Sequence, residues 1–180
     1  KRNNVDKIVK LIPAEERKKL WGMGIKIGRY HIYLPKMLKP KAVEFRISLW
    51  KIYHNFSAKN KIPKSGLNFL IGLKFDKDFL LLCGFEKFRE FFVRIDILEK
   101  LFLKIIDSTK DKKFTVNADM MNLLGCSKEN FYKLMTYMDY KKDKAVDTYI
   151  FKGDKRKKKK IIQFDKKENP FNKLLSLNIK

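Results

Sequence analysis

The sequence predicts an α+β fold, mostly α, in which an N-terminal helix/extended/helix segment precedes a domain of three helices and a β-hairpin. Apolar residues recur at helical spacing in several stretches, and shorter β-prone stretches are bounded by Gly and Pro. Apolar residues make up 44% of the 180 residues and include 15 Phe, enough for the core of one ordinary domain or two small ones.

The first forty residues contain signals for a helix and for an extended segment. Pro13 followed by AEERKKLW predicts a helix start, because Pro suits an early helical position and Glu15 and Glu16 suit the positive end of the helix dipole. That helix should stop near Gly22. The stretch GMGIKIGRYHIYLP is β-prone and closes at Pro35, which predicts an extended segment or a short hairpin.

Another helix is predicted from Pro40 onward, through KAVEFRISLWKIYHNF. Its apolar positions fall on one face and on the adjoining flank. Those on the face are Val43, Ile47 and Trp50, and those on the flank are Phe45, Leu49 and Ile52. So wide an apolar stripe predicts that most of this helix is buried.

The second half of the chain shows a recognisable order of elements. VRIDILEKLFLKIIDS predicts a helix, KFTV a strand, NADMMNLLG a short helix and KENFYKLMTYMD a helix after a turn at Gly125. Asn117 and Ser127 stand where N-caps belong. DTYIFKG, KRKKKK and IIQF then predict a strand, a charged loop and a strand. This order predicts a winged-helix domain, a helix-turn-helix with a β-hairpin.

These elements divide the chain into four parts. The stretch 57–68 gathers Ser, Asn, Pro and Gly without periodicity and marks the internal boundary. We expect a helical segment over 1–56, a linker and transitional segment over 57–93, the winged-helix domain over 94–165 and a C-terminal tail over 166–180. The residues expected to be buried together in the winged-helix core are Ile95, Leu98, Leu101, Phe102, Phe131, Leu134, Met135 and Met138. Ile105 and Ile106 continue the helical spacing of the first helix.

The composition is strongly basic. The chain has 43 Lys and Arg against 20 Asp and Glu, which gives a formal net charge of +23. A field of this sign attracts polyanions, and nucleic acid is the leading candidate. An alternative stays open, because only seven of the basic residues are Arg and the abundance of Lys, Asn, Ile and Phe is typical of an AT-rich genome.

Three clusters are candidate nucleic-acid-binding sites. The first is the tip of the predicted hairpin, where mutual repulsion favours a nearby polyanion: Lys155, Arg156, Lys157, Lys158, Lys159 and Lys160. The second is the last predicted helix, with Lys128, Asn130, Tyr132 and Lys133. The third combines a cation with aromatic rings on which bases could stack: Arg29, Tyr30 and His31, with Tyr33 beside them.

Each cluster has a limit or an alternative. The hairpin tip could be a merely solvated basic loop, and the third cluster could be a half-buried strand. In the helix, Glu129 and Asp139 offset the lysines. Phosphate or single-strand contact without strong sequence preference is therefore favoured over base reading in a major groove.

Signatures of catalysis and of metal binding are absent from the sequence. No GxxxxGK[ST] loop occurs, so ATP hydrolysis cannot be assigned to these residues. His31 and His54 lack partners at zinc-ligand spacing. Cys83 and Cys126 have apolar neighbours and are expected to be buried thiols in a reducing, cytoplasmic compartment.

Two further features of the sequence do not indicate a functional site. Asp96 and Glu99 lie on an otherwise basic and apolar helix and are interpreted as solvated surface charges. The longest apolar runs fall far short of the roughly 20 residues of a membrane span, so no membrane contact is expected.

Several stretches resemble the region that follows the motor core in alphaproteobacterial helicases related to the RNA helicase of the mitochondrial degradosome. They are, in order, GIKIGRYHIYLPKMLKPKAVEFRISLW, FFVRIDILEKL, FTVNADMMNLLGCSKENFYKLMTYMDY, a basic stretch and ENPFNKLLSL. The resemblance covers nearly the whole chain from about Ala14, through core and turn residues rather than catalytic signatures.

The resemblance implies a superfamily-two helicase whose ATP site and Mg²⁺ ligands lie upstream of Lys1, so no cofactor is expected in this chain. The chain would then be its C-terminal accessory region, packed on the helicase core in cis and holding single-stranded RNA or DNA. Two alternatives stay open, a stand-alone winged-helix DNA-binding protein and a module that docks a ribonuclease partner.

Overall fold

The computed structural model describes residues 1–54, 62–72, 76–143 and 147–151. The helices are α1 (Arg2–Leu11), α2 (Ala14–Gly22), η1 (Pro35–Leu38), α3 (Pro40–Tyr53), α4 (Lys77–Leu82), α5 (Ile95–Ser108), α6 (Ala118–Leu124) and α7 (Lys128–Tyr137). The strands are β1 (Lys26–Ile27), β2 (Ile32–Tyr33), β3 (Phe69–Ile71), β4 (Phe85–Phe88), β5 (Phe91–Arg94), β6 (Lys113–Thr115), β7 (Lys141–Lys142) and β8 (Thr148–Ile150). The predicted α+β class is confirmed at this level.

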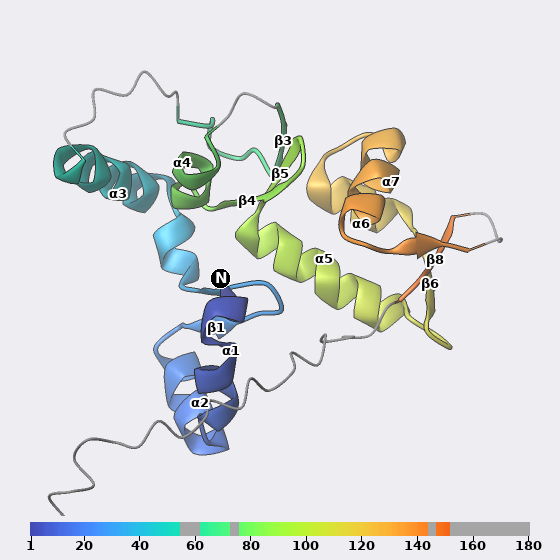
Figure 1. The fold of residues 1–180 in the computed structure, drawn as a ribbon, viewed down its shortest axis with the longest axis horizontal. Helices are drawn as coiled ribbons and strands as arrows, with labels where there is room; N and C mark the ends of the chain where they lie inside the picture. Colours follow the sequence, from blue (N-terminus) through green and yellow to red (C-terminus); the bar gives the residue numbers. More distant parts are fainter. Residues whose placement is uncertain (55–61, 73–75, 144–146, 152–180) are drawn as a thin grey trace, which may run out of the picture.

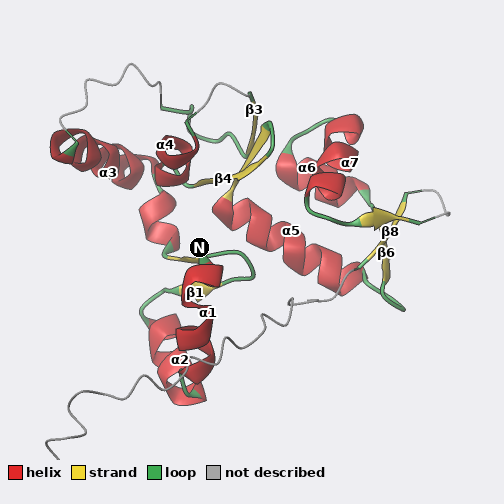
Figure 2. Cartoon of the chain, in the orientation of Figure 1, coloured by secondary structure: helices red, strands yellow, loops and turns green. Residues whose placement is uncertain are grey.

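Helix α5 runs through the middle of the molecule (Figures 1 and 2). On one side lie α3, α4 and the antiparallel sheet β3-β5-β4, and on the other lie α6, α7 and the antiparallel sheet β6-β8-β7. Helices α1 and α2 form an N-terminal pair, and β1 and β2 form a short hairpin within 22–35, where an extended segment or a short hairpin was predicted.

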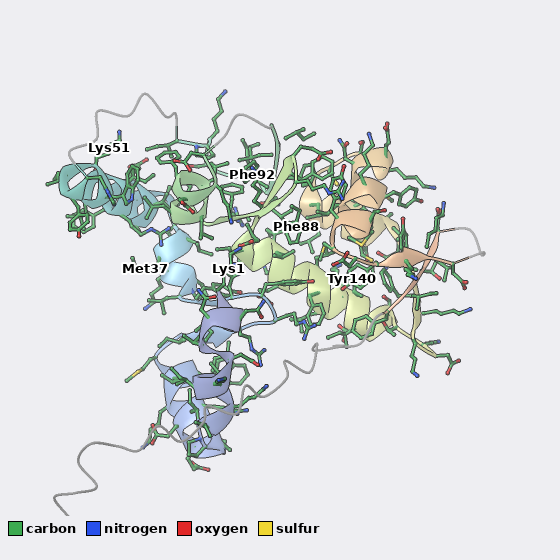
Figure 3. The ribbon with its side chains drawn as sticks, viewed as in Figure 1. Lys1, Met37, Lys51, Phe88, Phe92 and Tyr140 are labelled. Atoms are coloured by element: carbon green, nitrogen blue, oxygen red, sulfur yellow. The ribbon has the colours of Figure 1, made fainter. Side chains whose placement is uncertain are left out.

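Strand β5 lies between two apolar clusters. Phe91 and Val93 belong to the cluster around α5, α6 and α7, whereas Phe92 belongs to the cluster between α3, α4 and β4. This division follows from the period of two in a strand, which sends neighbouring side chains to opposite faces. Figure 3 shows Phe92 and Phe88 beside the β4–β5 hairpin. The 57–93 segment, expected to be transitional, therefore contains a three-stranded sheet and a helix.

The second half of the chain has the predicted order through α5, β6, α6 and α7, and β8 lies in the predicted strand DTYIFKG, whereas β7 was not predicted. Asn117 and Ser127 are N-caps, each accepting a hydrogen bond from a backbone N–H in the first turn of α6 or α7. Gly125 ends α6 at a φ of 68°, a left-handed conformation that favours glycine. Six of the eight residues of the predicted core are buried, and Phe102 and Met138 are half-buried. Ile106, which shares the helical spacing of α5, is exposed.

The hairpin differs from the prediction. The described hairpin joins β7 to β8 through residues 143–147, and the strand predicted in DTYIFKG is its second arm. Strand β8 pairs with β6 on one edge and with β7 on the other, so both of its edges are occupied. The basic run 155–160 and the IIQF stretch lie outside the described residues. The placement of that run at the tip of a hairpin with β8 is therefore corrected.

The expected burial of α3 is wrong. Val43 and Ile47 are buried and Trp50 is half-buried, as their shared face predicted. The flank is exposed instead, at Phe45, Leu49 and Ile52, and so is Tyr53. Only one face of the helix meets α4 and β4, because the N-terminal helices pack elsewhere (Figure 1).

Candidate nucleic-acid interface

The C-terminal sheet gathers lysines where the described chain ends. Ile150 lies opposite Lys113 on one side and Lys141 on the other. Beyond it, the N–H of Phe151 donates to the carbonyl oxygen of Lys112 at 2.7 Å. Because cross-strand neighbours lie close together on one face of a sheet, the charges of Lys113 and Lys141 share one surface.

Two of these lysines are exposed and have no ion pair with any described residue, namely Lys112 and Lys141. Lys113 is partly neutralised, since its Nζ lies 2.7 Å from Oδ2 of Asp143. The predicted basic cluster, from Lys155 to Lys160, lies outside the described residues and begins four positions after the last of them. The chain thus leaves the sheet beside lysines and continues into a longer run of cations.

The lysines of α7 are each paired with a carboxylate. Lys128 Nζ lies 3.0 Å from Oδ2 of Asp147, and Lys133 Nζ lies 2.8 Å from Oε1 of Glu129. These hydrogen bonds raise the pKa of both lysines above the ordinary value. Of the two acidic residues predicted to offset these lysines, Glu129 does so by pairing with Lys133, whereas the partner of Lys128 is Asp147 of the β7–β8 connection and not Asp139.

Tyr132 lies at the centre of this surface. Its hydroxyl donates to Asp147, and the ammonium groups of Lys128 and Lys142 each lie 5.5 Å from the centre of its ring. The hydrogen bonds from Tyr132 and Lys128 hold the pKa of Asp147 below its usual range. Asn130 is half-buried, and its backbone N–H lies 3.3 Å from the hydroxyl that caps α7. An aspartate thus occupies the place between cations where a phosphate could bind.

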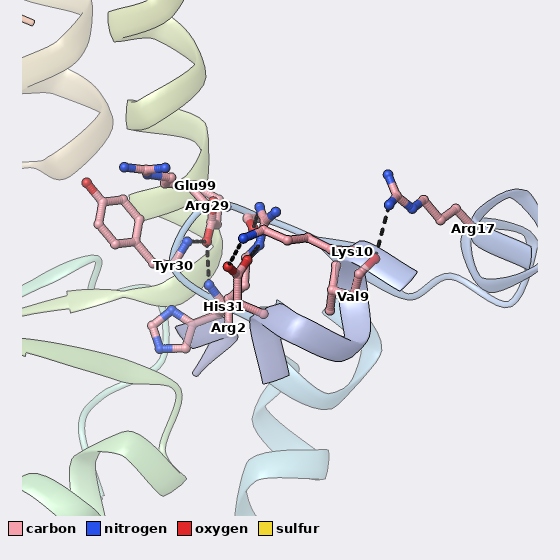
Figure 4. Close-up of polar contacts among 10 residues, drawn as sticks. Arg2, Val9, Lys10, Arg17, Arg29, Tyr30, His31 and Glu99 are labelled. Atoms are coloured by element: carbon pink, nitrogen blue, oxygen red, sulfur yellow. Dashed lines mark hydrogen bonds and ion pairs between the residues drawn. The ribbon is translucent and has the colours of Figure 1, made fainter. Parts of the chain in front are cut away.

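The third predicted cluster is organised by a buried carboxylate (Figure 4). Glu99 of α5 accepts hydrogen bonds from the backbone N–H groups of Arg29, Tyr30 and His31, at 2.6, 2.8 and 2.9 Å. The interpretation of Glu99 as a solvated charge is therefore wrong. Asp96 is half-buried and bound by Arg94 through two hydrogen bonds, so its interpretation is corrected as well. No local sequence pattern indicates a partner about 70 positions away.

His31 takes part in a second buried contact. Its Nε2 lies 2.9 Å from Oε2 of Glu86, whose other oxygen accepts from the ammonium group of Lys1. Burial opposes the ionisation of Glu86, but the hydrogen bonds from His31 and Lys1 outweigh it and hold the carboxyl pKa below its usual value. These contacts tie the N-terminal segment to β4.

The structure divides the predicted cluster. His31 is buried, and so is most of Tyr30, whose ring meets Phe88 and Phe102 edge-on. The His31 side chain is packed inside, so its assignment as a binding residue is corrected, whereas Tyr30 is half-buried and its assignment stays a prediction. Arg29 differs, because it lines a surface hollow with its guanidinium 5.5 Å from the centre of the Phe102 ring.

Two surface hollows of about 550 Å³ each are lined by Trp21. This residue was not among the binding residues predicted from the sequence. Both are lined by Arg2, Trp21 and Ile27. Trp21 is 66% exposed, and the ammonium group of Lys26 lies 4.8 Å from the centre of its ring. An exposed Trp between Gly-rich turns and basic residues was the available signal.

The remaining expectations concern metals, thiols and membranes. Among the described residues no three His, Cys, Asp or Glu side chains converge on a potential metal position. Cys83 is buried and Cys126 is half-buried, and burial raises the pKa of each thiol to about 11. Within the described ranges, no helix has both the length and the apolarity needed to cross a bilayer.

Comparisons of the chain with protein-family models, curated proteins and solved structures find no match. The resemblance to the helicase family thus remains a prediction from the sequence motifs.

Proposed function

We propose that this chain binds RNA or DNA without strong sequence preference, through a winged-helix domain, as a C-terminal accessory region of an ATP-dependent helicase. The winged-helix assignment is supported by the order α5, β6, α6, α7, β7, β8 and by the strand order β6-β8-β7. In this topology the connection between the last two strands is the wing and α7 corresponds to the second helix of the helix-turn-helix.

One observation carries the nucleic-acid proposal. Lys112 and Lys141 flank the end of β8, and the chain continues from there into the run 155–160. Consecutive cations such as those of the run 155–160 repel one another, and a polyanion relieves that repulsion by displacing small counterions. A backbone of regularly spaced phosphates matches a row of lysines better than a small anion does.

The ion pairs and the side-chain composition of α7 support a weak sequence preference. Its lysines are held by Asp147 and Glu129, and its surface offers no Arg or Gln for bidentate contacts with base edges. Contacts with the phosphate backbone need only unpaired charge. Those charges lie on the sheet and in the basic run that follows it.

The test compares two double variants with the same change in net charge. Lys112→Asn with Lys141→Gln should lower the magnitude of the slope of log affinity against log salt by roughly 1.4 to 1.8, at 0.7 to 0.9 per lost phosphate contact. Asn suits residue 112, because Lys112 has a φ of 62°. The control, Lys36→Gln with Lys39→Gln, changes exposed lysines near η1 and should leave the slope nearly unchanged. Equal effects of both pairs, or no binding by the parent chain, would contradict the proposal.

A second proposal concerns the expected packing of residues 1–56 on a helicase core in cis. Phe45, Leu49, Ile52 and Tyr53 are all exposed, and their spacing places them on one stripe of α3. A contiguous apolar stripe on a helix surface is typical of an interaction site. Its occupant would be the motor core that the family resemblance places upstream.

The packing proposal can be tested in the longer protein. Leu49→Asp with Ile52→Asp should lower the melting temperature of the protein that includes the core and leave that of the isolated chain unchanged. Equal effects in both proteins would argue against packing in cis. Sequence upstream of Lys1 that lacks GKT-type and DExH-type motifs would favour the alternative of a stand-alone DNA-binding protein.

A further inference from the structure

We propose that Trp21 is a stacking platform for an unpaired base, at the centre of a groove that binds single-stranded nucleic acid and is distinct from the lysine-bearing end of the C-terminal sheet. This inference rests on the proposed nucleic-acid binding and adds a second contact region with a preference for unpaired strands.

Local structure holds Trp21 at the surface. It lies next to the last residue of α2, and the turn that follows is fixed by two hydrogen bonds, from Gly24 N–H to the Trp21 carbonyl at 2.9 Å and from Ile25 N–H to the Leu20 carbonyl at 3.0 Å. Gly24 has a φ of 85°, a conformation that favours glycine. The indole is therefore presented by a defined turn and does not depend on a long loop.

The space around the indole suits a nucleotide. Each adjoining hollow has a volume of about 550 Å³, which is within the usual range for small-ligand sites. Both are lined by Arg2, Trp21 and Ile27, so the two hollows adjoin at these side chains, and the pair is called the groove here. Leu103 of α5 and Val9 of α1 add apolar surface, one on each side.

Cations lie in both halves of the groove. Lys26 and Arg29 line the half toward α5, and Arg17 and Lys18 line the half toward α1. Arg17 is positioned by a 3.0 Å hydrogen bond from its Nη2 to the Val9 carbonyl (Figure 4). The groove thus places a cation on each side of an aromatic ring. This order matches that of phosphate, base and phosphate along a single strand.

Two carboxylates near the groove are already engaged. Glu99 lines the half toward α5, but three backbone N–H groups bind its oxygens. Asp6 lies 2.9 Å from Lys10 Nζ and 3.6 Å from Arg2 Nε. The residues that line the groove include five Lys or Arg and one Glu, so its net charge is positive, which favours an anionic ligand.

An unpaired strand fits this site better than a duplex. In a duplex the bases are stacked on one another, so no base face is available to the indole. An acidic protein segment would satisfy the cations but supplies no base for Trp21. A contact with Trp21 that depends on the presence of a base therefore distinguishes a single strand from an acidic protein segment.

The chain has two tryptophans, so Trp50→Phe leaves Trp21 as the only indole fluorophore. Trp50 lies on α3, away from the groove, and Phe can retain its apolar contact with Phe79. In this variant, an oligothymidine of about 12 nucleotides, within the site sizes of single-strand binders, should quench the fluorescence with saturation. An abasic oligonucleotide of equal length and a duplex should quench it far less.

Substitution of Trp21 in the otherwise natural chain supplies the second measurement. Trp21→Ala should weaken binding of the single strand about 5- to 160-fold, which corresponds to 1–3 kcal/mol of stacking per base. Duplex affinity should not change, and Trp21→Phe should give an intermediate loss. Met23→Ala, which removes a neighbouring exposed side chain, is the matched control and should bind as the parent does. Thermal melting verifies that each variant is folded.

Each outcome decides between the two proposals. Anisotropy that reports binding while Trp21 fluorescence stays unchanged overturns the stacking inference and leaves the nucleic-acid proposal standing. Equal quenching by the thymidine and abasic strands also overturns it, because phosphate contact alone would then explain the signal. No binding of either strand or of the duplex overturns the proposed function, and the stacking site with it. Quenching only by an acidic peptide would assign the groove to a protein partner.

Discussion

Gly28 lies directly against the carboxyl group of Glu99, so closely that a Cβ at residue 28 would overlap the carboxyl carbon and both oxygens. Glu99 cannot move away without losing three backbone hydrogen bonds. The absence of a side chain at residue 28 is thus what lets the β1–β2 turn sit on α5.

The first prediction follows from that contact. Gly28→Ala should destabilise the fold by about 1–3 kcal/mol, the usual cost of inserting a group into a packed site, measured by urea unfolding. Gly22→Ala is the control, because a Cβ there meets nothing within 4 Å and Gly22 has no left-handed backbone. In a Glu99→Ala background the cost of Gly28→Ala should shrink. Equal costs at both glycines would show that the carboxyl is not the obstacle.

The second prediction concerns pH. Hydrogen bonds from His31 and Lys1 keep the pKa of Glu86 lower in the folded than in the unfolded protein. Its stabilising contribution is therefore fully present above about pH 4.5, the ordinary glutamate value, and is lost as pH falls through the lower folded pKa. Glu86→Gln should reduce stability at neutral pH, and the difference from the parent should shrink below pH 4.5. A difference that is constant from pH 3 to pH 7 would contradict this.

The third prediction concerns the basic run. Replacing Lys157, Lys158, Lys159 and Lys160 with Ala should weaken binding to RNA and to DNA alike, with each lost phosphate contact lowering the salt slope by roughly 0.7 to 0.9. Folding stability should barely change, because these like charges contribute little to folding and their removal relieves repulsion. Salt titrations followed by fluorescence anisotropy measure both the affinity and its dependence on salt.

A control for the basic run removes the same charge elsewhere, at Lys36, Lys39, Lys41 and Lys77, all exposed. If both quadruple variants lose the same affinity, the run acts only through net charge. If neither does, it is a solvated segment.

The fourth prediction concerns the internal anion of the α7 surface. Asp147→Asn should strengthen binding and increase the salt slope by up to about 0.9, because Lys128 becomes available to a phosphate. Asp139→Asn is a close control, because both aspartates have a positive φ. It is 57° at Asp147 and 66° at Asp139, and Asn also tolerates this conformation. It removes the same charge but no partner of Lys128. Equal gains would mean that Asp147 acts only through net charge.

Local signals predicted the second half of the chain well. The caps Asn117 and Ser127 and the apolar period of α5 depend on residues a few positions apart, so a sequence displays them directly. The hairpin was misplaced because a short strand does not reveal which partner occupies its edges. Only the register showed that β7 fills the free edge of β8.

The buried polar contacts could not be predicted in the same way. Nothing in the sequence of α5 distinguishes Glu99 from a solvated charge, because its donors are backbone groups about 70 positions earlier in the chain. His31 looked like part of an aromatic binding cluster because the sequence did not show Glu86 beside it. Burial of α3 was overestimated since a wide stripe does not say how many neighbours are present.

Strand β5 has a consequence for how the molecule opens. Phe91 and Phe92 are adjacent but belong to different clusters, and the strand is hydrogen-bonded to β3 and β4 on its two edges. Strand β5 cannot leave its place without exposing side chains of both clusters, so we expect the two to lose structure together. The amide hydrogens of β5 would then exchange with solvent only through global unfolding, more slowly than those of α1 and α2.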